Sequence, residues 1–242
     1  MKSYILIAIF LFTTGIFAQS LEGSWKLVEE NGREITDKEV IRIYQDGYFA
    51  EGAKKTENNA FLWAQGGEYD SGDYTETIDF HTMNKDLVGV DIDPKLTWEG
   101  DDRIKINNVK ELQVWERVSD NKNELTGNWV ITGRQRNGEM RRSTPGDRRT
   151  IKILAGDRFQ WVAFNSATGE FMGTGGGTYS AENGKYTENI QFFSRDDSRV
   201  GASLGFDFEV KDGEWHHSGK SSKGEPMYEI WSPYAAAYLG NQ

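Results

Sequence analysis

The chain repeats its own pattern, and this repetition limits the folds open to it more than any other feature. The Leu-x-Gly-x-Trp segment that begins at Leu21 returns at Leu125. Further segments return in the same order while their separation grows slowly, and the pairs are 41–43 with 151–153, 66–69 with 176–179, 74–76 with 186–188, 88–89 with 200–201, and 114–115 with 230–231. Because order is kept and only loop lengths drift, we predict two homologous domains, residues 19–119 and 124–234.

Each copy is punctuated by tight-turn signals, in which Asn or Asp precedes Gly and supplies the positive φ angles of β-hairpins. Examples are Asn31-Gly32, Asp46-Gly47, Asn137-Gly138, Asn183-Gly184 and Asp212-Gly213. Between such turns, apolar and polar residues alternate with period two, which predicts half-buried strands. An all-β fold follows, with sequential hairpins that favour an up-and-down antiparallel barrel in each copy.

Residues 1–18 show the pattern of a secretory signal peptide: Lys2, an apolar run from Tyr4 to Phe12, and small residues before Ala18. We expect cleavage after Ala18 and a soluble product that is secreted or periplasmic, since the apolar run is too short to span a bilayer and no later stretch could do so. The chain has no cysteine, which excludes disulfides, thiolate metal sites and cysteine nucleophiles.

The balance of charge argues against polyanionic partners. Lys and Arg number 28 against 38 Asp and Glu, a formal net charge of −10. Nucleic acid and anionic membranes need a net attractive field, so we expect neither nucleic-acid binding nor membrane insertion. Six arginines nevertheless cluster between Arg134 and Arg149. They could dock the two domains together, lie solvated in a loop, or meet an anionic ligand or polysaccharide.

Three segments of the second copy carry a family resemblance: Gly175-Gly176-Gly177-Thr178-Tyr179, Tyr186-Thr187-Glu188-Asn189-Ile190 and Tyr228-Glu229-Ile230-Trp231. With the Gly-x-Trp of the first strand, they are similar to secreted bacterial lipocalin-like domains of the calycin superfamily. The resemblance implies two tandem antiparallel up-and-down lipocalin-like β-barrels. It says less about activity, because such barrels host binding proteins, haem carriers and a few enzymes.

The same resemblance implies how one barrel end is closed. In that family an arginine of the last strand packs over the first-strand tryptophan. The first copy has both residues, as Trp25 and Arg117, whereas the second copy has Trp129 but Ser232 at the place of the arginine. The closed end of the second barrel is therefore expected to be built differently.

Strand alternation places one carboxylate on the apolar row of each copy. Glu188 shares a face with Tyr186, Ile190 and Phe192, and Glu76 is its counterpart in the first copy. A carboxylate among apolar side chains costs free energy unless it is paired. Glu188 is thus either a structural group bonded within the barrel or a group that orients a ligand or transfers a proton.

The two neighbouring histidines must point to opposite faces of their strand. Aligning the copies at a separation of 112 residues matches His216 with Ile104 and Ser218 with Ile106. Ile104 and Ile106 form an apolar alternating pair that we interpret as facing inward. We therefore predict that His216 and Ser218 face the cavity and His217 faces solvent. The alternative for His216 is an ordinary hydrogen-bonded histidine near the barrel mouth.

These residues lead to three hypotheses. The first is a non-enzymatic binding protein that holds a small molecule in its second barrel, with a site lined by Trp161, Tyr186, Glu188, His216 and Ser218. The second is an enzyme in which Glu188 and His216 act as an acid/base pair on a carbohydrate or small metabolite. The third is a surface module without a pocket, which would meet a carbohydrate or envelope partner. No catalytic motif, metal-ligand spacing or cofactor signature is predicted.

Overall fold

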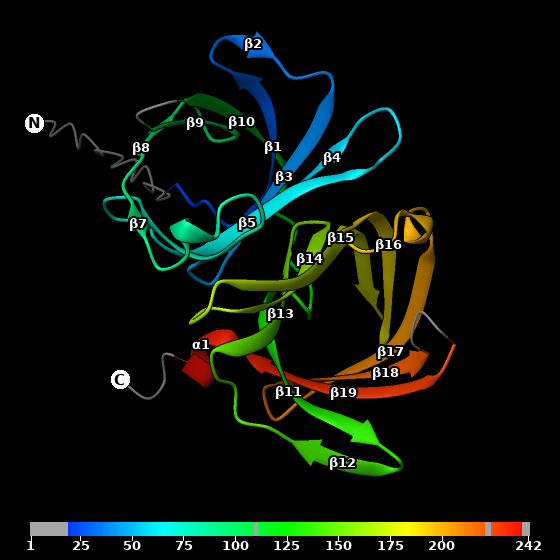
Figure 1. Cartoon of the computed structure of the whole chain (residues 1–242). Coiled ribbons are helices and arrows are strands. Elements are labelled where there is room, and N and C mark those ends of the chain that lie inside the picture. The colour runs from blue at the N-terminus through cyan, green and yellow to red at the C-terminus, as the bar shows by residue number, and fades with distance from the viewer. Residues whose placement is uncertain (1–18, 109–110, 221–223, 239–242) are drawn as a thin grey trace, which may run out of the picture.

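The computed structural model describes residues 19–108, 111–220 and 224–238, so the predicted signal peptide lies outside the described residues. Within these ranges the chain is built from β-strands that form two antiparallel sheets, one from each half (Figure 1). The all-β expectation is confirmed. Helical structure in the described part is limited to the short turns η1 (Lys85–Leu87) and η2 (Asp197–Arg199) and to α1 (Tyr234–Tyr238).

The first sheet is curled into a half-barrel and follows the chain as a meander. Its order is β7-β6-β5-β4-β3-β1-β10-β9-β8, with β2 paired to β1. The strands are β1 (Gly23–Glu30), β2 (Arg33–Glu34), β3 (Lys38–Gln45), β4 (Tyr48–Lys55), β5 (Phe61–Asp70), β6 (Thr75–His81), β7 (Asp91–Ile92), β8 (Lys95–Trp98), β9 (Arg103–Asn107) and β10 (Leu112–Ser119).

The second sheet closes into an eight-stranded barrel, because β11 pairs with both β13 and β19. The hairpin strand β12 extends from β11 and lies outside the ring. The strands are β11 (Gly127–Arg136), β12 (Glu139–Arg142), β13 (Arg148–Ala155), β14 (Arg158–Asn165), β15 (Glu170–Glu182), β16 (Lys185–Phe193), β17 (Ser203–Lys211), β18 (Glu214–Lys220) and β19 (Pro226–Pro233).

The expectation of two closed barrels is therefore correct for the second half and wrong for the first. In the second half the single long strand β17 pairs with β16 on one side and β18 on the other. In the first half its place is taken by two short strands, β7 on β6 and β8 on β9, with no pairing between them in the described residues. Asp93 and Pro94 separate these strands. Proline has no N–H to donate to a ladder, so it interrupts the strand that would close the ring.

One end of the first half is closed as the resemblance implied. The Arg117 guanidinium lies 4.2 Å from the centre of the Trp25 ring and donates to the backbone carbonyls of Ser20 and Glu22. In the second half, Trp129 makes the same indole bond to the preceding leucine carbonyl that Trp25 makes. The residue opposite Trp129 is Pro233, not Ser232, so the predicted position was displaced by one residue.

The two halves share an apolar core on their outer faces. Side chains that point out of the first sheet, among them Ile43, Tyr48 and Phe80, pack with Ile151 and Phe164 of the second sheet. All five are 2% exposed or less. This contact covers the outer faces of β3 and β13, whose inner faces are already buried within their own halves. Residues on both faces of these strands are therefore buried, and the strands lack the usual alternation of buried and exposed residues.

A polar seam crosses the same contact between the halves. The hydroxyl of Tyr234 accepts from Arg149 at 2.6 Å and donates to Glu68 at 3.0 Å. Arg149 also lies 3.7 Å from Asp79 of the first half. The contacts of Tyr234 with Glu68 and of Arg149 with Asp79 join the two halves, so they help to fix the register in which the apolar faces meet.

Candidate functional site: the cavity of the second barrel

The closed barrel holds a cavity of about 390 Å³, which falls in the range of small-molecule sites. Most of its wall is apolar or aromatic. Its lining side chains include Trp161, Ala163, Ile190, Phe193, Ala202, Leu204, Phe206, Met227 and Trp231. The polar lining residues come from several elements, so they can orient a molecule that the apolar wall holds, and they are Arg134, Thr150, Lys152, Glu188, Arg199, His217 and Glu229.

A buried ion pair lies on this wall. The Lys152 ammonium of β13 donates to the Glu188 carboxylate of β16 at 2.6 Å, and both residues are 5% exposed. The hydroxyl of Tyr186 donates to the same carboxylate oxygen at 2.9 Å. The Lys152 ammonium also lies 5.2 Å from the ring centres of Tyr186, Trp215 and Trp231. Glu188 is therefore paired from within the barrel, which is the structural alternative left open by the sequence.

His217 of β18 lies at the cavity and is 2% exposed. Its ring packs against Phe206 at 4.4 Å and Trp215 at 5.1 Å between centres. Neither ring nitrogen has a hydrogen-bond partner among the described residues, and Nδ1 lies 3.6 Å from a carboxylate oxygen of Glu229. Burial lowers the pKa of His217 below its usual range, so the ring is neutral near pH 7.

Glu229 of β19 stays ionised beside this histidine. Burial opposes its charge, but the neighbouring cations Arg134 and Lys152 lower the pKa of Glu229 below its usual range. The closest of these contacts is a bond of 2.6 Å from the Arg134 guanidinium. The cavity thus holds two carboxylates, each compensated by a cation from another strand.

The structure places the predicted site residues in two groups. Trp161 and Glu188 line the cavity, and Tyr186 lies behind Glu188, fully buried. His216 and Ser218 lie on the other face of β18, and the His216 ring bonds the Tyr228 hydroxyl at 2.8 Å. The predicted inward positions of His216 and Ser218 are wrong. Consequently Glu188 and His216 do not converge into the acid/base pair of the enzyme hypothesis.

The cause of this error is a slip of one residue between the copies. In the first half Ile104 pairs with Trp115 and Ile106 with Gln113, while in the second half Trp215 pairs with Trp231 and His217 with Glu229. These register positions match at a separation of 111 residues, not 112. Since side chains alternate between faces, a shift of one exchanges the inward and outward sets.

Three residues of the cavity were not predicted from the sequence: Lys152, His217 and Glu229. Lys152 was hidden because its neighbours Ile151 and Ile153 are apolar and buried against the other half, so the inward row of β13 did not stand out. The internal repeat could have revealed Lys152, because it aligns this residue with Arg42 of the first copy. A cation in the middle of the same strand of both copies indicates a buried charged cluster.

His217 makes stability sensitive to mild acid. A folded-state pKa below the unfolded value of 6.5 means that the unfolded chain takes up the proton first, so stability falls as pH drops below 6.5. Urea unfolding at pH 7.5 and 5.5 should show that His217→Gln reduces this loss, which is at most about 1.4 kcal/mol per pH unit for one proton. An unchanged loss in the variant would contradict a neutral buried His217. The range stays above the titration of Glu229.

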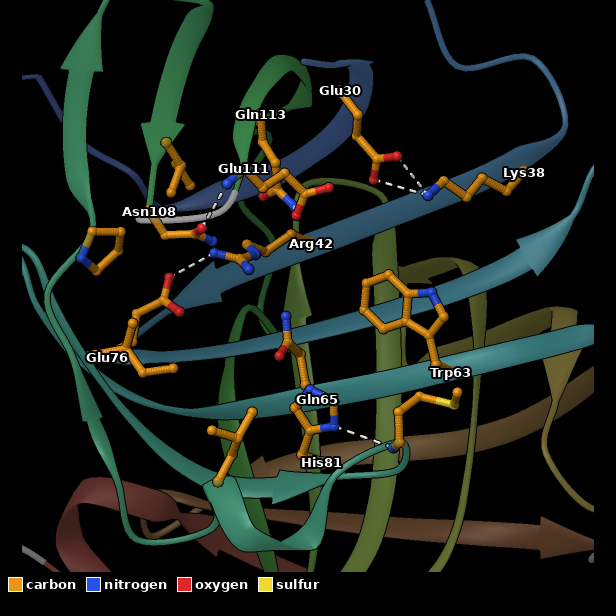
Figure 2. Close-up of a pocket in the computed structure, with 15 residues that line it drawn as sticks. Glu30, Lys38, Arg42, Trp63, Gln65, Glu76, His81, Asn108, Glu111 and Gln113 are labelled. Atoms are coloured by element: carbon orange, nitrogen blue, oxygen red, sulfur yellow. Dashed lines mark hydrogen bonds and ion pairs between the residues drawn. The ribbon is translucent and has the colours of Figure 1, made fainter. Parts of the chain in front are cut away.

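The half-barrel holds a second and larger cavity of about 550 Å³ with a different lining (Figure 2). Arg42 and Glu76 meet inside it at 2.6 Å, with Trp63 and Gln65 on the neighbouring wall. Arg42 also pairs with the fully buried Glu51. Although burial alone would lower it, these two carboxylates raise the pKa of Arg42 above its ordinary value.

The surroundings of the two buried cations differ at one pair of equivalent register positions. Glu51 pairs across the ladder with Arg42, and Trp161 pairs in the same way with Lys152. The first half therefore surrounds its cation with two carboxylates, and the second replaces one of them with an indole. Trp161 is accordingly the counterpart of Glu51, and it makes the second cavity more apolar.

The third histidine, His81, lines the first cavity. Its Nδ1 accepts the backbone N–H groups of Met83 and Asn84 at 3.1 and 3.0 Å. Among the described residues, no group of three or more His, Asp or Glu side chains is arranged to hold a metal ion. In the same ranges no helix is long and apolar enough to cross a membrane.

Comparison with known proteins gives no relative from which to infer function, so the proposal below is argued from the structure. No family model matches the chain, and no curated protein matches it. The class that the fold defines is an all-β protein with one closed eight-stranded antiparallel barrel and one curled half-barrel. This arrangement is compatible with a lipocalin-like fold.

Proposed function

We propose that the protein is a secreted or periplasmic binding protein that holds a small molecule in the cavity of its second-half barrel. The observation that carries this proposal is the apolar cavity of about 390 Å³ with a buried histidine on its wall whose two ring nitrogens have no hydrogen-bond partner among the described residues. Buried polar groups are nearly always paired, so unpaired ones on a cavity wall leave hydrogen bonds that a bound molecule can make.

The polar groups of this cavity suit a ligand that carries hydrogen-bonding atoms at one end. His217 can donate one hydrogen bond and accept another, and the buried indole N–H of Trp231 also lacks a partner in the described part of the chain. Both residues line the cavity. A ligand that satisfied them would gain these bonds in addition to the burial of its apolar surface.

The wider identity of the chain is part of the same proposal. Two lipocalin-like copies that arose by duplication account for the matched strand order, the paired tryptophans and the buried cation shared by β3 and β13. A signal peptide cleaved after Ala18 accounts for the apolar leader. The partner is a small molecule, and a carbohydrate or other envelope component remains within this class.

Filling the cavity tests the proposal. Ala163 lines the cavity, so Ala163→Phe should place a ring in it and weaken binding of the neutral dye N-phenyl-1-naphthylamine by at least about tenfold. Dye fluorescence is titrated with both proteins, and native mass spectrometry of the protein as purified shows whether a retained molecule is lost with the same substitution. Ala167→Phe, in an exposed loop, is the matched control and should bind the dye as the original protein does.

The outcomes separate clearly. Dye binding and retained mass that both disappear in Ala163→Phe but persist in Ala167→Phe support a barrel site. A dye that binds all three proteins equally, with no retained molecule in any of them, would sink the proposal. Unfolding midpoints of the three proteins are compared in parallel, so that loss of binding is not confused with loss of the fold.

A further inference from the structure

A groove lined by arginines opens beside the cavity of the second barrel. It has a volume of about 490 Å³ and lies among β11, β12 and the beginning of β13. Its lining residues include Arg134, Arg136, Arg141, Arg142, Arg148 and Arg149, and they include no Asp or Glu. Five of these arginines, all except the largely buried Arg149, are exposed, and in a chain of net charge −10 they make a local site for negative charge.

Half of these arginines have no carboxylate partner in the described part of the chain. Arg134, Arg142 and Arg149 pair with acidic residues outside the groove lining. Arg136, Arg141 and Arg148 are exposed and form no ion pair with a described residue. The cluster is made of arginine rather than lysine, and a guanidinium binds carboxylate, sulfate or phosphate oxygens through two parallel hydrogen bonds.

The groove and the cavity share part of their walls. Arg134 and Thr150 line both of them. Arg134 belongs to the groove, yet its guanidinium bonds Glu229 of the cavity. β11 pairs with β13 over residues 127–130 and then with β12 over residues 133–136. The groove and the cavity meet at the end of the barrel where this change of partner occurs.

We infer that the ligand of the second barrel is an amphiphile whose apolar part lies in the cavity and whose oxyanion head group lies against the arginine groove. This inference rests on the proposed function and names the chemical class of its ligand. The cavity supplies apolar wall, and the adjoining groove supplies guanidinium groups that have no carboxylate partner among the described residues.

The test compares probes that carry one or both features. Decyl phosphate has the chain and the head group, 1-decanol has the chain alone, and inorganic phosphate has the head group alone. Each is titrated, below the concentration at which it self-assembles, by displacement of N-phenyl-1-naphthylamine and by calorimetry. Decyl phosphate is expected to bind at least about tenfold more tightly than either partial probe, and its affinity should fall with added salt.

The variant that tests the groove replaces its three unpaired arginines, as R136Q/R141Q/R148Q. It should weaken decyl phosphate by at least about tenfold and leave 1-decanol unchanged, because the charge-assisted bonds are lost and the apolar wall is kept. The matched control removes the same charge elsewhere, at three exposed lysines, as K26Q/K55Q/K211Q. It should bind every probe as the original protein does.

Other results would overturn the inference and leave the proposed function standing. Equal affinity for decyl phosphate and 1-decanol, unaffected by the arginine variant, would mean that the cavity ignores the groove. Inorganic phosphate binding as tightly as decyl phosphate would make the groove an independent anion site. Binding to vesicles with anionic phospholipid but not to monomeric decyl phosphate would assign the groove to a membrane surface. If neither the dye nor 1-decanol binds, the proposed function itself fails.

Discussion

Arg42→Met is expected to lower the free energy of unfolding by about 3–5 kcal/mol, because it leaves Glu51 and Glu76 buried without their cation. Both carboxylates are 5% exposed or less. The guanidinium also lies over the rings of Phe49 and Trp115, at 4.8 and 5.0 Å, and methionine restores only part of that packing. Urea unfolding of the whole protein at pH 7.5 measures the loss.

The loss should shrink in acid. Burial already raises the pKa of Glu51 beside Arg42, and removing the guanidinium raises it further. A carboxyl group whose folded pKa lies above its unfolded value destabilises the fold at higher pH, and the cost is relieved as pH falls through the folded pKa. The difference between Arg42→Met and the original protein is therefore expected to be smaller at pH 5 than at pH 7.5.

Two further variants make this prediction specific to buried charge. The triple variant Arg42→Met, Glu51→Gln, Glu76→Gln removes the stranded charges and should regain most of the loss. Lys185→Met breaks an ion pair with Asp207 whose side chains are 72% and 63% exposed, and it should leave the unfolding midpoint unchanged. An Arg42→Met protein as stable as the Lys185→Met protein would show that the cluster contributes little to stability.

Gly177→Ala is expected to destabilise the second barrel by at least about 3 kcal/mol. A Cβ atom at this position would overlap the backbone carbonyl oxygen of Asn189 and lie 2.9 Å from the backbone nitrogen of Gln191. The β15 and β16 ladder shifts register between Gly176 and Gly177, so the close approach belongs to a β-bulge. Relief requires movement of backbone, because no flexible side chain stands in the way.

Gly205 offers the matched control in the neighbouring pair of strands. It pairs with Thr187, and a Cβ there would meet nothing within 4 Å. Gly205→Ala should be neutral or should stabilise by up to about 1 kcal/mol, since alanine restricts the unfolded chain. Thermal and urea unfolding of the two variants decide the matter. Equal stability in Gly177→Ala and Gly205→Ala would mean that the bulge opens at no cost.

The fold was predictable to the extent that it depends on local pattern. Turn pairs such as Asn183-Gly184 adopt the positive φ angles expected of hairpins, and alternation in β6 and β16 matches their buried rows. Closure was not predictable, because it depends on whether the last strands meet across a distance in sequence. Pro94 is the visible reason that the first ring stays open, yet a single proline is also common at harmless strand ends.

The candidate site was predictable for residues on strongly alternating strands and not elsewhere. Glu188 on β16 was assigned correctly to the interior. His216 and Ser218 were assigned to the wrong face, because faces were transferred between copies and one residue of slip reverses them. Lys152 was missed because both faces of β13 are buried, one inside the barrel and one against the other half. The alternation of residues along one strand does not show that its outer face also packs against another sheet.

The apolar contact between the halves couples the stability of each half to that of the other. Neither half can open without uncovering the outer face of its neighbour, where Tyr48 and Phe80 meet Ile151 and Phe164. A molecule held by the second half therefore adds its binding energy to the stability of both, by mass action. Under the proposed function, a molecule bound in the closed barrel would therefore also stabilise the half-barrel, whose ring is open, and its cavity.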